Sequence, residues 1–156
     1  MVRDAFFGLV LLGLTGWNAN AAEMRSLEEY MALPSDLQEP SYLFVRCAGL
    51  YWAMTAYFGE SGLGAEAHLN MSEAAILLNE AAILMRITKG GDTNHIEAGT
   101  RADAKRIATI YHERMRDNYA LTGQAFYEDS LIKSDLLLCK PIAANPVGFM
   151  LEQPSE

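Results

Sequence analysis

Five charged residues interrupt otherwise apolar helical patterns, and these residues are candidates for binding or acid–base chemistry. They are Arg46, Glu80, Asp103, Arg114 and Asp135. Charged groups drawn into a cleft acquire shifted pKa values and are common in functional sites. The same pattern is also typical of ion pairs that fix the register of packed helices. Acid–base catalysis would further require two of the carboxylates to lie close together. We therefore expect structural ion pairs and keep a binding site as the alternative.

Cys47 and Cys139 are the only cysteines in the sequence. In an oxidising compartment such a pair is typical of a disulfide, and no C-x-x-C motif supports redox catalysis or haem attachment. A bridge would close a loop of about 90 residues, which corresponds to roughly 4 to 5 kcal/mol in the chain-entropy model. We predict a structural disulfide.

Other motifs for chemistry are missing or incomplete in this sequence. The histidines are His68, His95 and His112, and none stands in H-x-x-x-H or H-E-x-x-H spacing. A calcium loop starting at Asp92 would need glycine at its sixth position, where Glu97 stands. The chain has neither a phosphate-binding P-loop nor a G-x-S-x-G motif. The sequence predicts no metal and no cofactor, and it favours a protein that is not an enzyme.

The candidate residues lie in four stretches with helical patterns. Residues 41–59 are strongly apolar and aromatic, and Arg46 is their only formal charge. A helix that is apolar on every side must be covered on every side, so we predict a central helix here. A second helix follows from an N-cap at Asn70, a third runs from about Asn94 to Leu121, and a fourth covers residues 125–138. The second and third helices start with capping-box spacing.

These helices predict an all-α fold, a four-helix up-down bundle within residues 41–140. Cys47 lies near the start of the first helix and Cys139 just after the fourth, so a disulfide would place these helices side by side and antiparallel. The same arrangement brings Arg46 close to Asp135. We predict a buried ion pair between these two residues, with Glu80 or Asp103 as competing partners for the arginine.

The two ends of the chain differ from the predicted bundle. Residues 1–21 resemble a cleavable signal peptide, because an apolar run at 5–17 precedes Ala19-Asn20-Ala21 and is too short to span a membrane. Residues 22–40 are polar, with a short helical turn predicted around 26–31. Residues 141–156 contain prolines, and we expect them to lie on the surface or to be disordered. The predicted location is the periplasm or the extracellular medium.

Charge and aromatic content narrow the possible partners. The net charge of -8 argues against nucleic acids and, more weakly, against anionic membrane surfaces. The aromatic residues of the first helix exceed what a thin bundle core buries, which favours a partner protein or a homodimer. We therefore predict an exported, non-enzymatic binding or accessory protein. The alternative is a small-ligand-binding bundle or small hydrolase that uses Arg46, Glu80 and Asp135, and a cavity lined by these residues would favour it.

Overall fold

The computed structural model describes residues 24–126 and 128–152. Every regular element in this part of the chain is helical, which confirms the predicted all-α class. The elements are α1 (Leu27–Met31), the 3-10 helix η1 (Ser35–Leu37), α2 (Pro40–Leu63), α3 (Ala65–Thr88), α4 (Thr93–Thr122), α5 (Ser130–Ala144) and α6 (Pro146–Glu152). The predicted signal peptide, residues 1–21, lies outside the described residues.

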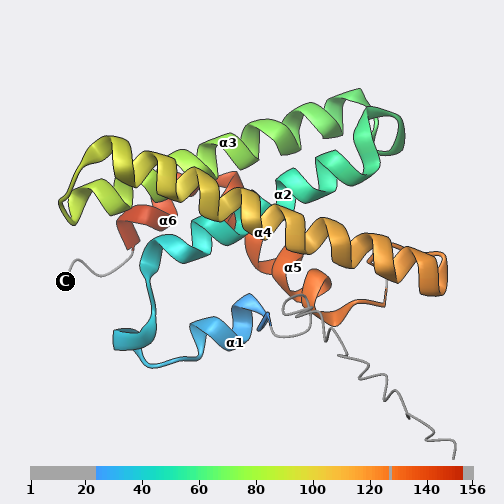
Figure 1. Ribbon diagram of the computed structural model, residues 1–156, viewed down its shortest axis with the longest axis horizontal. Helices are drawn as coiled ribbons and strands as arrows, with labels where there is room; N and C mark the ends of the chain where they lie inside the picture. Colours follow the sequence, from blue (N-terminus) through green and yellow to red (C-terminus); the bar gives the residue numbers. More distant parts are fainter. Residues whose placement is uncertain (1–23, 127, 153–156) are drawn as a thin grey trace, which may run out of the picture.

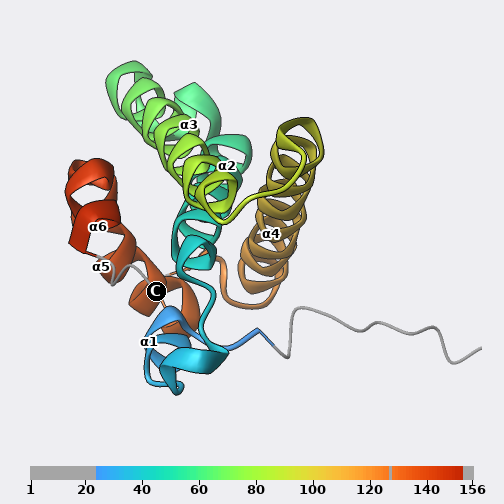
Figure 2. The same cartoon turned by 90° about the vertical axis from the view of Figure 1, so that its left-hand side faces the viewer.

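Helix α2 is the central helix, as its apolar sequence predicts. Figures 1 and 2 show α3 and α4 along two sides of α2, while α1, α5 and α6 lie toward its remaining side. Phe44, Val45 and Leu50 of α2 are completely buried. At Gly49 the packing against α4 is so close that a Cβ atom would lie 2.6 Å from Cγ2 of Ile107. A glycine is therefore needed where these two helices cross.

The glycine-rich sequence of residues 59–68 favours a flexible loop between the first two long helices, but the structure has helix over most of this segment. Helix α2 continues to Leu63 with a break at Gly59, and Gly64 alone connects it to α3. Both glycines have positive φ angles, 60° and 83°, which residues with a side chain rarely adopt. Because one glycine can redirect the chain, α3 begins at Ala65, and the prediction that Asn70 caps it is wrong.

The predicted limits of the last two long helices also need correction. Helix α4 is capped by Asp92, whose side chain accepts a hydrogen bond from the backbone N–H of His95, so Asn94 is not the cap. Helix α5 begins only at Ser130, because Asp129 accepts a hydrogen bond from the backbone N–H of Ile132 at 3.0 Å. Residues 123–126 and 128–129 form turns rather than helix.

Helix α5 continues past the predicted end at Leu138. It includes Pro141 and ends at Ala144, and α6 follows after Asn145. Ile142 is almost fully buried and belongs to the hydrophobic core. Burial of this side chain offsets the backbone hydrogen bond that a proline cannot donate. The predicted tail is therefore helical rather than disordered over residues 141–144 and 146–151, and Ile142 is buried, while Val147 and Leu151 lie on the surface as expected.

The predicted disulfide between Cys47 and Cys139 is present. It joins α2 to α5 across a sequence separation of 92, and both cysteines are completely buried. The bridge fixes the relative position of two helices that carry charged residues beside their cysteines.

Within residues 24–126 and 128–152, none of the helices combines the length and the apolar character that a membrane span requires.

Candidate functional site

Arg46 of α2 and Asp135 of α5 form the buried ion pair that the sequence predicts. Their Nη2 and Oδ2 atoms lie 2.6 Å apart, and the side chains are 1% and 0% exposed. The disulfide explains how the pair is positioned, because Cys47 follows Arg46 directly and Cys139 follows Asp135 by about one helical turn. A charge pair at this depth is tolerated only when its remaining polar atoms also have partners.

Two tyrosines and the chain before α1 supply those partners. Arg46 donates through Nε to the hydroxyl of Tyr111 at 2.5 Å and through Nη1 to the hydroxyl of Tyr42 at 3.0 Å. Its Nη2 also donates to the carbonyl oxygen of Arg25 at 2.7 Å. We call Arg46, Tyr42, Tyr111 and Asp135 the buried network. These bonds involve all three guanidinium nitrogens of Arg46.

Both oxygens of the Asp135 carboxylate are used as well. Oδ1 accepts a hydrogen bond from the backbone N–H of Leu27 at 2.6 Å, while Oδ2 accepts from Tyr111 as well as from Arg46. Burial, the largest effect, raises the pKa of Tyr111 well above its ordinary value, so the hydroxyl keeps its proton and can donate it. Burial alone would lower the pKa of Arg46, but Tyr111 and Asp135 outweigh burial and raise it.

The buried network therefore resembles a structural clamp more than a binding site. Its polar atoms are directed at one another and at the backbone of Arg25 and Leu27. The side chain of Leu27 is completely buried and belongs to the hydrophobic core. The network thus attaches the segment before α1 to the junction of α2, α4 and α5. This arrangement provides firm packing rather than an accessible acid or base.

The other three predicted site residues lie in separate ion pairs. Glu80 accepts from Arg101 at 2.7 Å, Asp103 from Arg86 at 2.9 Å and from Arg106 at 3.1 Å, and Asp129 accepts from Arg114 at 2.5 Å. The predicted set thus falls into four groups rather than one site. Neither Glu80 nor Asp103 is the partner of Arg46.

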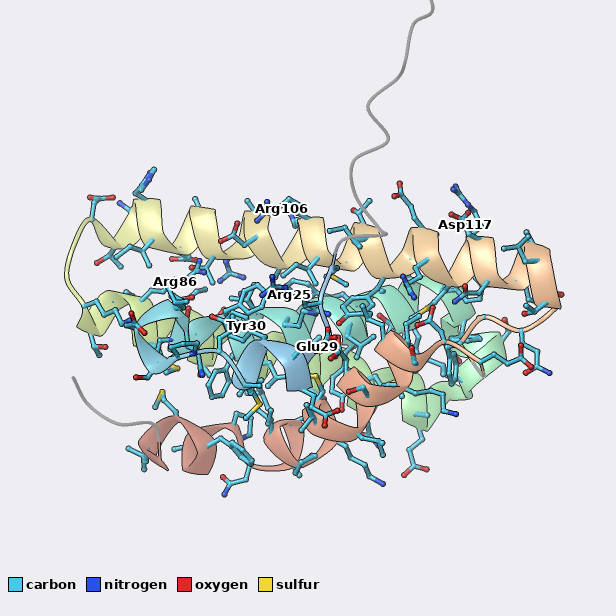
Figure 3. All side chains as sticks on the ribbon, turned by 90° about the horizontal axis from the view of Figure 1, so that it is seen from below. Arg25, Glu29, Tyr30, Arg86, Arg106 and Asp117 are labelled. Atoms are coloured by element: carbon cyan, nitrogen blue, oxygen red, sulfur yellow. A yellow bond between two sulfur atoms is a disulfide. The ribbon has the colours of Figure 1, made fainter. Side chains whose placement is uncertain are left out.

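Arg86 is a residue that the sequence analysis did not single out. Its Nε donates to the hydroxyl of Ser41 at 2.8 Å, and its Nη1 reaches Thr100 and Asp103. Figure 3 shows Arg86 between α4 and the start of α2. Arg86 could have been recognised in the sequence because it is the only arginine in the last turn of an apolar helix. This cluster joins the ends of α2, α3 and α4, and it is half-buried.

A surface hollow lies next to Arg114, where α4 ends and α5 begins. It has a volume of about 250 Å³, and its lining is entirely polar: Arg114, Asn118, Thr122, Gln124, Glu128, Asp129 and Ser130. Asp129 accepts hydrogen bonds from Arg114, Asn118 and the backbone N–H of Ile132. Burial raises the pKa of Asp129, but these hydrogen bonds outweigh burial and lower it overall. Arg114 and Asn118 thus hold the carboxylate that caps α5.

The position of this hollow bears on the ligand-binding alternative. Neither it nor the shallower hollow around Gly64 is lined by Arg46, Glu80 or Asp135. Among the described residues, no cluster of three or more histidine, cysteine, aspartate or glutamate side chains is arranged to hold a metal ion. Neither of these two hollows therefore supports ligand binding or hydrolysis by Arg46, Glu80 and Asp135.

Helix α3 exposes four large apolar side chains along its length. Leu69, Ile76, Leu77 and Leu84 are 57%, 51%, 57% and 53% exposed. Glu66, Glu73 and Glu80 lie on the same side of the helix, and we call these seven residues the α3 surface. By contrast, the aromatic residues of α2 are buried or half-buried under the neighbouring helices. Exposed apolar side chains are therefore found on α3, whereas the aromatic helix, where the sequence suggested a contact surface, has its aromatic residues buried or half-buried.

Asn79 lies on a buried side of α3. It is 1% exposed, and neither its amide nitrogen nor its amide oxygen has a hydrogen-bond partner within residues 24–126 and 128–152. Asn79, Ile83 and Arg86 are spaced i, i+4, i+7, so they share one face of the helix. Arg86 reaches Thr100 and Asp103 of α4, which places Asn79 on the side of α3 that faces α4.

Comparisons with protein-family models, with curated proteins and with solved structures find no match for this chain.

Proposed function

We propose that this protein is an exported, non-enzymatic binding or accessory protein that acts through protein–protein contacts on the α3 surface. The main support for this proposal is the contrast between the interior charges and the exposed apolar residues. The interior charges are paired with one another, whereas four large apolar side chains of a single helix are at least half exposed. Contiguous exposed apolar residues are typical of surfaces that bind other proteins.

The proposed export depends on the sequence of residues 1–21 and agrees with the disulfide. Disulfides persist mainly in oxidising compartments such as the periplasm or the extracellular medium. The proposal includes signal-peptide cleavage after Ala21 and an up-and-down order of the four long helices. The mass of the protein purified from its own cells tests the cleavage: a chain starting at Ala22 supports it, and an intact Met1 contradicts it.

A photo-reactive amino acid placed at Leu77 tests the proposed contact surface in the native cell. The matched control is the same amino acid at Leu121, which is 84% exposed at the end of α4. We expect a cross-linked product with another protein chain from position 77 and none from position 121. No product from position 77, or the same products from both positions, would contradict a binding role for the α3 surface.

A further inference from the structure

The charges on the α3 surface follow a regular repeat. Glu66, Glu73 and Glu80 are spaced seven residues apart in the sequence. At about 100° per residue, the seven residues of the α3 surface fall within an arc of roughly 100°, and they extend over about 27 Å of helix. A seven-residue repeat keeps a stripe facing a second helix that packs alongside at a small angle. The spacing therefore suits a helical partner.

The apolar residues form two rows, one on each side of the glutamates. Leu69 and Ile76 belong to one row, and Leu77 and Leu84 belong to the other. Within the part of the chain that the structure describes, Figures 1 and 2 show no other helix on the side of α3 that faces away from α2; its neighbours α4, α5 and α6 contact α3 elsewhere. A partner helix with apolar side chains could pack between these rows, as in other helix-in-groove complexes.

The glutamates determine which helix could bind. Glu66 and Glu73 are exposed, and no basic residue within residues 24–126 and 128–152 forms an ion pair with either of them. Glu80 is held by Arg101 at 2.7 Å, yet the glutamate side chain remains 45% exposed. Covering carboxylates without supplying positive charge would be costly. A suitable partner must therefore bring lysine or arginine residues.

We propose that the α3 surface binds a basic amphipathic helix of a partner protein. Its lysine or arginine side chains would face Glu66 and Glu73, and its apolar side chains would contact Leu77 and Leu84 and the row opposite. This inference rests on the proposed function and specifies the chemistry of the partner.

A second copy of this chain fits the same surface poorly. The apolar residues are symmetric about the point between Ile76 and Leu77, so an antiparallel pair of α3 helices would match them well. That arrangement, however, places Glu73 of one copy opposite Glu80 of the other. A parallel pair would place each glutamate against its own counterpart. Like charges in direct opposition are destabilising, and an anionic membrane would repel the stripe in the same way.

Binding of two synthetic peptides to the purified protein tests the proposal. One is a 24-residue amphipathic helix with lysine at the a position of each heptad and leucine at the d and e positions, so that leucines flank a central row of lysines, and its twin carries glutamate in place of lysine. Fluorescence anisotropy of the labelled peptides measures the affinity at about 0.15 M salt, where screening limits long-range attraction. We expect the lysine peptide to bind and its twin not to bind. Equal binding of both peptides, or binding of neither, would overturn the proposal.

Matched variants separate binding at the α3 surface from general attraction to an acidic protein. Glu66→Gln combined with Glu73→Gln should weaken binding of the lysine peptide about tenfold, whereas Glu28→Gln with Glu113→Gln, the same charge change elsewhere, should alter it less than about twofold. Leu77→Gln with Leu84→Gln should weaken it about tenfold or more, and Leu121→Gln with Leu137→Gln should have little effect. Circular dichroism verifies that each variant is folded. If the variants of the α3 surface lose no more affinity for the lysine peptide than their controls do, the peptide binds by general charge attraction. That result would overturn the proposal.

The two proposals fail in different ways. If position 77 forms a cross-link to a protein in cells but the lysine peptide does not bind, the proposal of protein binding stands. The proposal of a basic helical partner is then wrong. If the adduct is a second copy of this chain and Leu77→Gln with Leu84→Gln abolishes a dimer in solution, the occupant is a second copy and the basic-helix proposal is wrong.

Discussion

The carboxylate of Asp135 accepts a hydrogen bond from the backbone N–H of Leu27, which lies 108 positions earlier in the chain. The same carboxylate neutralises Arg46, and Arg46 in turn donates to the carbonyl oxygen of Arg25. One buried ion pair thus binds a backbone donor at the start of α1 and a backbone acceptor just before it. This geometry explains why a polar N-terminal segment remains packed on an otherwise apolar bundle.

Asp135→Asn should be strongly destabilising. The substitution keeps the shape of the side chain but leaves Arg46 buried without a negative charge, which typically costs about 3–5 kcal/mol of the free energy of unfolding. Asp103→Asn is the control, because Asp103 is half exposed and its loss should cost less than about 1 kcal/mol. Urea unfolding measures both. Similar losses for the two variants would show that the buried network contributes no more than a surface ion pair.

Loss of the disulfide should lower stability by a comparable amount. Replacing Cys47 and Cys139 with alanine removes a link across 92 positions, for which the chain-entropy model gives roughly 4 to 5 kcal/mol. Thermal unfolding with and without a reducing agent measures this effect. The reducing agent should shift the midpoint of the natural protein and leave that of the double variant unchanged. An unshifted natural protein would contradict the expected contribution.

Asn79→Leu should stabilise the protein, unlike most substitutions in a core. The buried amide of Asn79 has no hydrogen-bond partner among the described residues, and a buried polar group in this state costs about 1–3 kcal/mol. A side chain of similar shape without polar atoms removes that cost. Asn70→Leu, on an exposed position of the same helix, should change the free energy of unfolding by less than about 0.5 kcal/mol. Destabilisation by Asn79→Leu would show that the amide has a role the structure does not reveal.

The contribution of Asp129 to stability should depend on pH. Its pKa is lowered in the folded protein, because the hydrogen bonds from Arg114, Asn118 and Ile132 outweigh the effect of burial. A lowered pKa stabilises the fold above the unfolded value of about 3.9, and this stabilisation is lost as the pH falls further through the folded value. The stability difference between the natural protein and Asp129→Asn should therefore be constant above about pH 5 and shrink below pH 4. A difference that is independent of pH would contradict this assignment.

The Arg46–Asp135 pair could be predicted because both residues lie close in sequence to the cysteines of the disulfide. A disulfide brings the neighbours of its two cysteines together, and a buried arginine requires a carboxylate. The partners of Glu80, Asp103 and Arg114 could not be predicted in this way. They depend on how α3 and α4 are rotated and on where α5 starts, and helical periodicity gives the face of a residue but not its neighbour.

The amino-acid sequence by itself determined that the described chain is helical, that α2 is buried and that the two cysteines pair. Each of these features follows from local composition and spacing, which act within a few turns of helix. Only the tertiary structure decided that Pro141 lies inside α5, that Asn79 is buried and that four large apolar side chains of α3 are exposed. Those outcomes depend on which surface each helix covers, because burial is a property of packed neighbours and not of any single segment.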